Sequence, residues 1–147
     1  MKVRVETEVQ NSMEEAYKLF DLNLFEKLAP PLSGLNVLRF DGCDKGHEVH
    51  LTLTPLKIKW VSLITENFQG SDEIYFVDEG RILPFPLTNW SHKHIIQKVN
   101  ETTCKIIDEI NFEAGLFGLP MQGIILAQMK MRSPIYKKCL SKLSSTP

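Results

Sequence analysis

The chain has 147 residues, of which 43% are hydrophobic and 24% are charged, the size and composition of one globular domain spanning residues 1–147. Its formal net charge is −1 and it has no cluster of lysines and arginines, so we do not expect it to bind nucleic acid. No apolar run approaches the ~20 residues of a membrane span, and the alternation of charged and apolar residues over positions 1–6 argues against a signal peptide.

The three cysteines are Cys43, Cys104 and Cys139, an odd number without paired spacing. None belongs to a C-x-x-C motif, which argues against a structural zinc site. Reduced thiols of this kind are typical of the cytosol, so we expect a cytoplasmic protein without disulfides.

The first elements of the chain are one strand and two short helices. Residues Lys2–Val9 alternate charged and apolar side chains, which predicts a half-buried strand. Asn11 or Ser12 can cap a short helix that follows. A second short helix is expected over Leu22–Leu28, ending before Pro30 and Pro31.

The middle of the chain is predicted to form about six strands at hairpin spacing. Their expected ranges are 36–40, 47–54, 58–68, 73–79, 89–99 and 103–112. Loops are expected over residues 80–87, which contain two prolines, and around Gly115 and Gly118.

A long helix is predicted over residues 121–143. Met121, Ile125 and Met129 begin an apolar stripe at spacings of three or four, and Pro134 is expected to kink the helix near Met131. The order of elements indicates an α+β helix-grip fold, in which a curved antiparallel sheet of about seven strands wraps around this helix. A cavity between the sheet and the helix is then expected.

The order of elements resembles the SRPBCC, or START-like, superfamily, which includes the birch-pollen allergens and polyketide cyclases. A narrower likeness to bacterial ligand-binding SRPBCC domain proteins depends on Phe76-Val77-Asp78-Glu79, Pro84-Phe85, Trp90-Ser91-His92-Lys93-His94 and Asp108-Glu109-Ile110-Asn111-Phe112. Those proteins have a G-P-aromatic motif and a W-x-H-x-H-x-F motif. In this chain Leu83 replaces the glycine of the first motif, Ile96 replaces the final aromatic residue of the second, and the loop before Trp90 is longer than theirs. The resemblance implies that the protein binds a hydrophobic small molecule.

The alternation pattern also predicts which polar side chains point inward. Trp90, His92, His94 and Ile96 share one face of their strand, and Cys104, Ile106, Asp108, Ile110 and Phe112 share one face of the next. A short turn over residues 100–102 then places Asp108 opposite His94 and Ile110 opposite His92. These groups could orient a ligand, act as acid and base, or form a satisfied buried pair that specifies the sheet register.

The same strand offers possible metal ligands, but a metal site is not expected. His92 and His94 point the same way and Asp108 could join them, but no fourth ligand is evident. We therefore expect neither a metal nor a cofactor. No G-x-S-x-G or G-x-x-x-x-G-K-[ST] motif is present, and nothing in the sequence requires an enzyme.

The leading hypothesis is a module that binds a small hydrophobic or amphipathic molecule, such as a lipid, a polyketide or an aromatic metabolite. One alternative is an enzyme of cyclase, isomerase or dehydratase type that uses His92, His94 and Asp108 as acid/base groups. A second is a protein-interaction domain with a collapsed pocket. The candidate ligand-binding residues are Trp60, Tyr75, Phe76, Trp90, His92, His94, Asp108, Met121, Ile125 and Met129.

Overall fold

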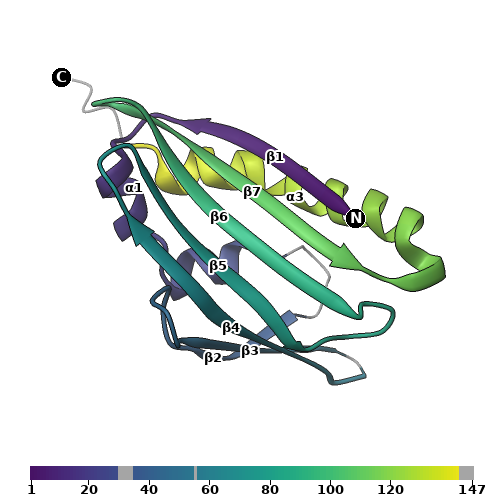
Figure 1. The fold of residues 1–147 in the computed structure, drawn as a ribbon. Helices are drawn as coiled ribbons and strands as arrows, with labels where there is room; N and C mark the ends of the chain where they lie inside the picture. The colour runs from purple at the N-terminus through teal and green to yellow at the C-terminus, as the bar shows by residue number, and fades with distance from the viewer. Residues whose placement is uncertain (30–34, 55, 143–147) are drawn as a thin grey trace.

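A curved antiparallel sheet holds a long helix against its inner face in the computed structural model, which describes residues 1–29, 35–54 and 56–142 (Figure 1). The sheet has seven strands in the order β1-β7-β6-β5-β4-β3-β2. The strands are β1 (Lys2–Val9), β2 (Leu35–Phe40), β3 (Glu48–Leu53), β4 (Ile58–Gln69), β5 (Glu73–Ile82), β6 (Asn89–Asn100) and β7 (Thr103–Glu113). The helices are α1 (Met13–Lys18), α2 (Leu22–Leu28) and α3 (Gly118–Leu140), with a short 3₁₀ turn, η1 (Gly115–Phe117), before α3.

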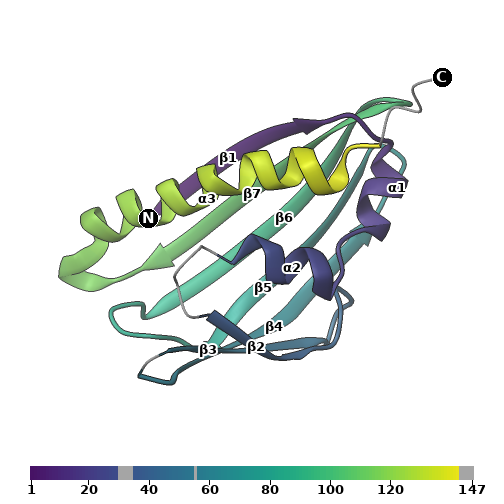
Figure 2. The ribbon, with the colours of Figure 1, turned by 180° about the vertical axis from the view of Figure 1, so that it is seen from behind.

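This is the predicted helix-grip arrangement, with α2 and α3 on the same face of the sheet (Figure 2). The bounds of β1 and α2 match the expected ones, and Ser12 caps α1 by accepting a hydrogen bond from the amide of Glu15 at 3.2 Å. Strand β5 is longer than expected, because Ile82 pairs with Val61 across an irregularity in the register and so extends the strand past residue 79.

The long helix begins at Gly118, where a loop was expected. Pro120 lies in its first turn, where backbone amides have no partner within the helix, so the missing donor of proline costs little there. The helix continues through Pro134 to Leu140. Ser141 has an extended backbone, so the helix is shorter than the range predicted to reach Leu143. The two prolines predicted to follow α2 lie outside the described residues. Among those residues, no helix is long and apolar enough to cross a lipid bilayer.

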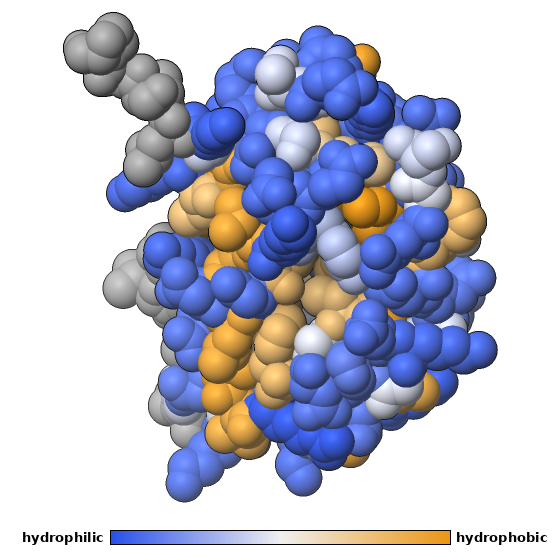
Figure 3. Space-filling model, turned by 90° about the vertical axis from the view of Figure 1, so that its left-hand side faces the viewer, coloured by the Kyte–Doolittle hydropathy of each residue, from blue (hydrophilic) through white to orange (hydrophobic). Residues whose placement is uncertain are grey.

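Two apolar clusters fill the two ends of the space between the sheet and α3. One surrounds Tyr136 and Leu140 near α1, and the other surrounds Phe112 and Ile125 near the start of α3. On the side of α1, apolar side chains reach the surface in a band flanked by polar ones (Figure 3). The space between the two clusters is a cavity.

Candidate functional site

The cavity has a volume of about 220 Å³ and lies between the inner face of the sheet, α2 and α3. Its walls are mainly apolar, and its aromatic side chains come from separate elements: Phe20, Phe25, Phe40, Trp60, Phe76 and Trp90. Trp60 and Trp90 meet edge to face, with ring centroids 4.9 Å apart, and they form a rigid corner of the wall. The volume exceeds the about 150 Å³ of an engineered cavity that accepts benzene, so it is large enough for a small aromatic molecule.

Six of the candidate ligand-binding residues line this cavity: Trp60, Phe76, Trp90, His92, His94 and Met129. The helix α3 contributes Met129 together with Gln128 and Arg132. Met121 and Ile125 lie nearer the start of α3, where they pack in the cluster around Phe112, so they act as core residues. Helical spacing alone does not distinguish a cavity wall from the core beside it.

Tyr75 does not line the cavity, which corrects the expectation from the sequence. Adjacent residues of a strand point to opposite faces of a sheet, so Tyr75 and Phe76 cannot both face inward. The ring of Tyr75 stacks on Phe68 with centroids 5.3 Å apart, and the Lys93 amine lies 4.0 Å from its centre. These contacts belong to the outer face of the sheet.

A buried polar cluster forms one wall of the cavity. We define it as Asp78 on β5, His92 and His94 on β6, and Asp108 on β7. The predicted register between β6 and β7 is confirmed, since His94 pairs with Asp108 and His92 pairs with Ile110. Asp78 pairs in turn with His92 across β5 and β6. The rings of His92 and His94 stack with centroids 3.6 Å apart.

The shortest hydrogen bonds of this cluster run diagonally rather than directly across the strands. His92 Nε2 lies 2.8 Å from Asp108 Oδ1, and His94 Nε2 lies 2.7 Å from Asp78 Oδ2. Asp108 therefore bonds to His92, whereas His94, its partner in the register, keeps its Nδ1 atom 3.7 Å away. The sequence predicted the neighbours correctly but not the choice of hydrogen-bond partner.

Asp108 is 1% exposed and does not line the cavity, so it supports the cluster from behind. Tyr136 on α3 donates its hydroxyl to Asp108 Oδ2 at 3.1 Å, and Arg132 Nη1 lies 3.6 Å from Oδ1. Burial alone would raise the pKa of Asp108, but the hydrogen bond from His92 and the nearby positive charge of Arg132 lower it below its ordinary value. The carboxyl group is therefore ionised at neutral pH.

His92 is 3% exposed, and burial together with the neighbouring His94 lowers the pKa of its imidazole to about 4, against the opposing effect of Asp108. A neutral imidazole carries one proton. Because ionised Asp108 can only accept a hydrogen bond, that proton lies on Nε2, and Nδ1 presents a lone pair toward the cavity side of the cluster.

Asp78 and Arg132 were not among the predicted site residues, yet both line the cavity. Burial would raise the pKa of Asp78, but the hydrogen bond from His94 and the charges around it keep the pKa lowered. The alternation that selected Phe76 also places Asp78 on the same inner face, so this residue could have been found by parity. Arg132 follows Met129 at a helical spacing of three, but its charge did not mark it as a site residue.

Comparison with solved structures gives matches across nearly the whole chain. A protein described as uncharacterised from Bacillus thuringiensis has a TM-score of 0.69 at 15% identity, covering 95% of this chain and 98% of that one. Norcoclaurine synthase from Thalictrum flavum, in complex with a transition-state analogue, has a TM-score of 0.67 at 12% identity, covering 95% and 93%. A hypothetical protein from Helicobacter pylori has a TM-score of 0.70 at 10% identity, covering 95% and 88%.

This is an SRPBCC-like fold. At these identities the likeness establishes the fold alone, and fold does not specify activity. No protein-family model matches the sequence, and no curated protein matches it. Another structure of norcoclaurine synthase contains dopamine and hydroxybenzaldehyde, at 14% identity and a TM-score of 0.61.

Proposed function

We propose that the protein binds a small, mainly apolar molecule that carries at least one polar group. The observation behind this proposal is the cavity of about 220 Å³, whose aromatic walls meet a polar wall at Asp78, His92 and His94. Pockets that bind small molecules generally combine apolar walls with a few polar groups that fix the orientation of the ligand.

The volume of the cavity favours one ligand class among those that the sequence left open. Pockets for drug-sized molecules range from about 300 to 1,000 Å³, so this cavity, at about 220 Å³, is smaller than that range. A molecule with one or two rings fits this volume better than a long lipid chain does. The ligands of norcoclaurine synthase, dopamine and hydroxybenzaldehyde, are of this size and support the same choice by analogy.

A fluorescent apolar probe tests the proposal. We expect about one probe to bind per native chain, with a change in the fluorescence of Trp60 and Trp90, since both side chains line the cavity. Met129→Trp should weaken binding because Met129 is 5% exposed and its enlarged side chain would occupy part of the cavity.

The matched control for this variant is Met131→Trp, because Met131 lies on the same helix but is 48% exposed. It should leave probe binding unchanged. Failure of the native protein to take up any probe, or equal binding by both variants, would refute a ligand site in this cavity.

The enzyme alternative has one observation in its favour, which is that His92 and His94 face the cavity together with Asp78. Asp108 lies behind His92, so in such an enzyme it would position that imidazole rather than touch the substrate. Chemical turnover of a bound molecule by the wild type, but not by His92→Gln, would favour this alternative. The collapsed interaction domain is disfavoured, since its interior would be filled.

A cytoplasmic location belongs to the same proposal. Cys43, Cys104 and Cys139 are all free thiols, which supports residence in a reducing compartment. Recovery of the protein from its host with any of these cysteines in a disulfide would contradict this expectation.

A further inference from the structure

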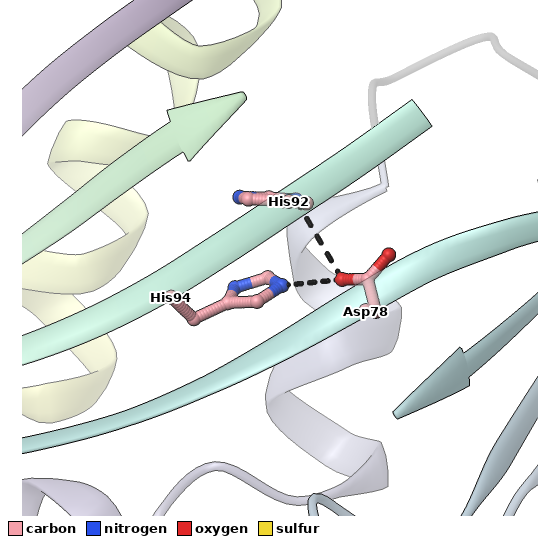
Figure 4. Close-up of side chains that lie close together, drawn as sticks. All are labelled: Asp78, His92 and His94. Carbon is pink, nitrogen blue, oxygen red and sulfur yellow. Dashed lines mark hydrogen bonds and ion pairs between the residues drawn. The ribbon is translucent and has the colours of Figure 1, made fainter. Parts of the chain in front are cut away.

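Each imidazole of the buried polar cluster lies between two carboxylates. His92 directs Nε2 toward Asp108 at 2.8 Å and Nδ1 toward Asp78 at 3.9 Å. His94 has the matching arrangement, with Nε2 toward Asp78 at 2.7 Å and Nδ1 toward Asp108 at 3.7 Å. One oxygen of Asp78 therefore faces a nitrogen of both rings, as Figure 4 shows.

This geometry leaves one contact of the cluster without a hydrogen bond. His92 Nε2 lies within hydrogen-bonding distance of Asp108, whereas the 3.9 Å between His92 Nδ1 and Asp78 Oδ2 is too long for a hydrogen bond. A cation bound between these two atoms would bring both into contact with one ion. Ligand atoms about 2.1 Å from a tetrahedral ion lie roughly 3.4 Å apart, so small side-chain shifts would complete the site.

We propose that Asp78, His92 and His94 bind a divalent first-row transition-metal ion. Their three donor atoms, a carboxylate oxygen and one nitrogen from each ring, lie within 4.8 Å of one another. Two imidazoles and one carboxylate form a donor set that suits Zn²⁺, Fe²⁺ or Co²⁺. No metal was expected from the sequence because no fourth ligand was evident beside His92, His94 and Asp108; Asp78 was not among the residues considered.

Asp108 has the role of a supporting residue in this site. Histidines that bind a metal generally donate their other ring N–H to a carboxylate, which fixes the tautomer and the ring orientation. His92 already does so, and His94 would carry its proton on Nδ1, toward Asp108, once Nε2 binds the metal. Tyr136 donates to Asp108 from the far side and keeps the carboxylate in place.

The charge of the cluster and its position favour a cation. Among the described residues, the guanidinium beside the two carboxylates is that of Arg132, whose Nη1 lies 3.6 Å from Asp108 Oδ1. A divalent ion would offset the remaining negative charge. All three ligand residues also line the cavity, so the open coordination positions of the ion would face the space for the small molecule. A bound metal could then hold an oxygen or nitrogen atom of that molecule.

Binding of Zn²⁺ and Co²⁺ to the metal-free protein tests this site. Calorimetry should give one ion per chain, and Co²⁺ should develop visible absorption bands. Asp78→Asn and His92→Gln should each weaken binding by more than about 100-fold, and Asp108→Asn by about 10–100-fold as the loss of a supporting residue. Glu109→Gln, the neighbouring change on the outer face, should have no effect.

Two controls separate this site from other metal-binding groups. His50→Gln removes a histidine outside the cluster, and Cys43→Ala removes a thiol that lines the same cavity; neither variant should lose the ion. If the cluster variants fail to fold, NMR spectra of the wild-type protein still test the site. Co²⁺ should perturb the ring signals of His92 and His94 and not those of His47 and His50.

The site is refuted if the metal-free protein binds no stoichiometric ion. It is equally refuted if folded Asp78→Asn binds as tightly as the wild type, or if only His47 and His50 respond to Co²⁺. The proposal does not depend on the proposed function, because the apolar probe is measured on metal-free protein and can succeed or fail separately.

Discussion

Replacing Asp108 with alanine should destabilise the protein more than any other change in the buried polar cluster. The side chain is 1% exposed and accepts hydrogen bonds from His92 at 2.8 Å and from Tyr136 at 3.1 Å. Its removal leaves two buried donors unpaired, at about 1–3 kcal/mol each. It also leaves Arg132 without the carboxylate that lies 3.6 Å from it, so we expect a total loss of at least roughly 2–6 kcal/mol in the free energy of unfolding.

Two further variants isolate the cause of this loss. Asp108→Asn keeps an acceptor for His92 but removes the charge beside Arg132, so it should cost about 1–2 kcal/mol. Glu109→Ala changes the next residue of β7, whose partner is Arg4 at 2.9 Å on the outer face. A partly exposed ion pair of this kind contributes about 0–1 kcal/mol.

Urea denaturation of the metal-free protein at neutral pH measures all three values. The expected order of destabilisation is Asp108→Ala, then Asp108→Asn, then Glu109→Ala. The reasoning fails if Glu109→Ala is as costly as Asp108→Ala, since the inner and outer faces of β7 would then be exchanged. It fails as well if Asp108→Ala costs less than about 1 kcal/mol, because buried donors would then not need this carboxylate.

Three further predictions concern other residues. Burial raises the pKa of the Cys43 thiol to about 12, so the thiol should react slowly with iodoacetamide at pH 8. The reaction should be slower still when an apolar probe occupies the cavity, which Cys43 lines; rapid alkylation detected by peptide mapping would contradict this. Tyr136→Phe should cost about 1–2 kcal/mol in urea denaturation because Asp108 loses a donor, and an unchanged midpoint would rule that out. Ser12→Ala should cost about 1 kcal/mol by removing the cap on the amide of Glu15, whereas Ser12→Asn should restore it.

The sequence by itself determined the strands and their inward faces. Successive side chains of a strand point to opposite faces of the sheet, so the face that carries the apolar residues is the buried one. The short turn between β6 and β7 then left one register that satisfied both strands, and it placed His94 opposite Asp108 as the structure does. The error at Tyr75 arose because Tyr75 and Phe76 were both chosen as aromatic residues. The same alternation allows only one of these two neighbours to face inward.

Only the tertiary structure decided which groups meet. The diagonal bonds from His92 to Asp108 and from His94 to Asp78 depend on ring rotation and on the twist of the sheet, neither of which alternation encodes. Asp78 enters through β5, a strand whose register to β6 the sequence analysis did not derive. The cavity likewise depends on how α2 and α3 pack across the curved sheet, because contacts between distant segments set the space that remains between them.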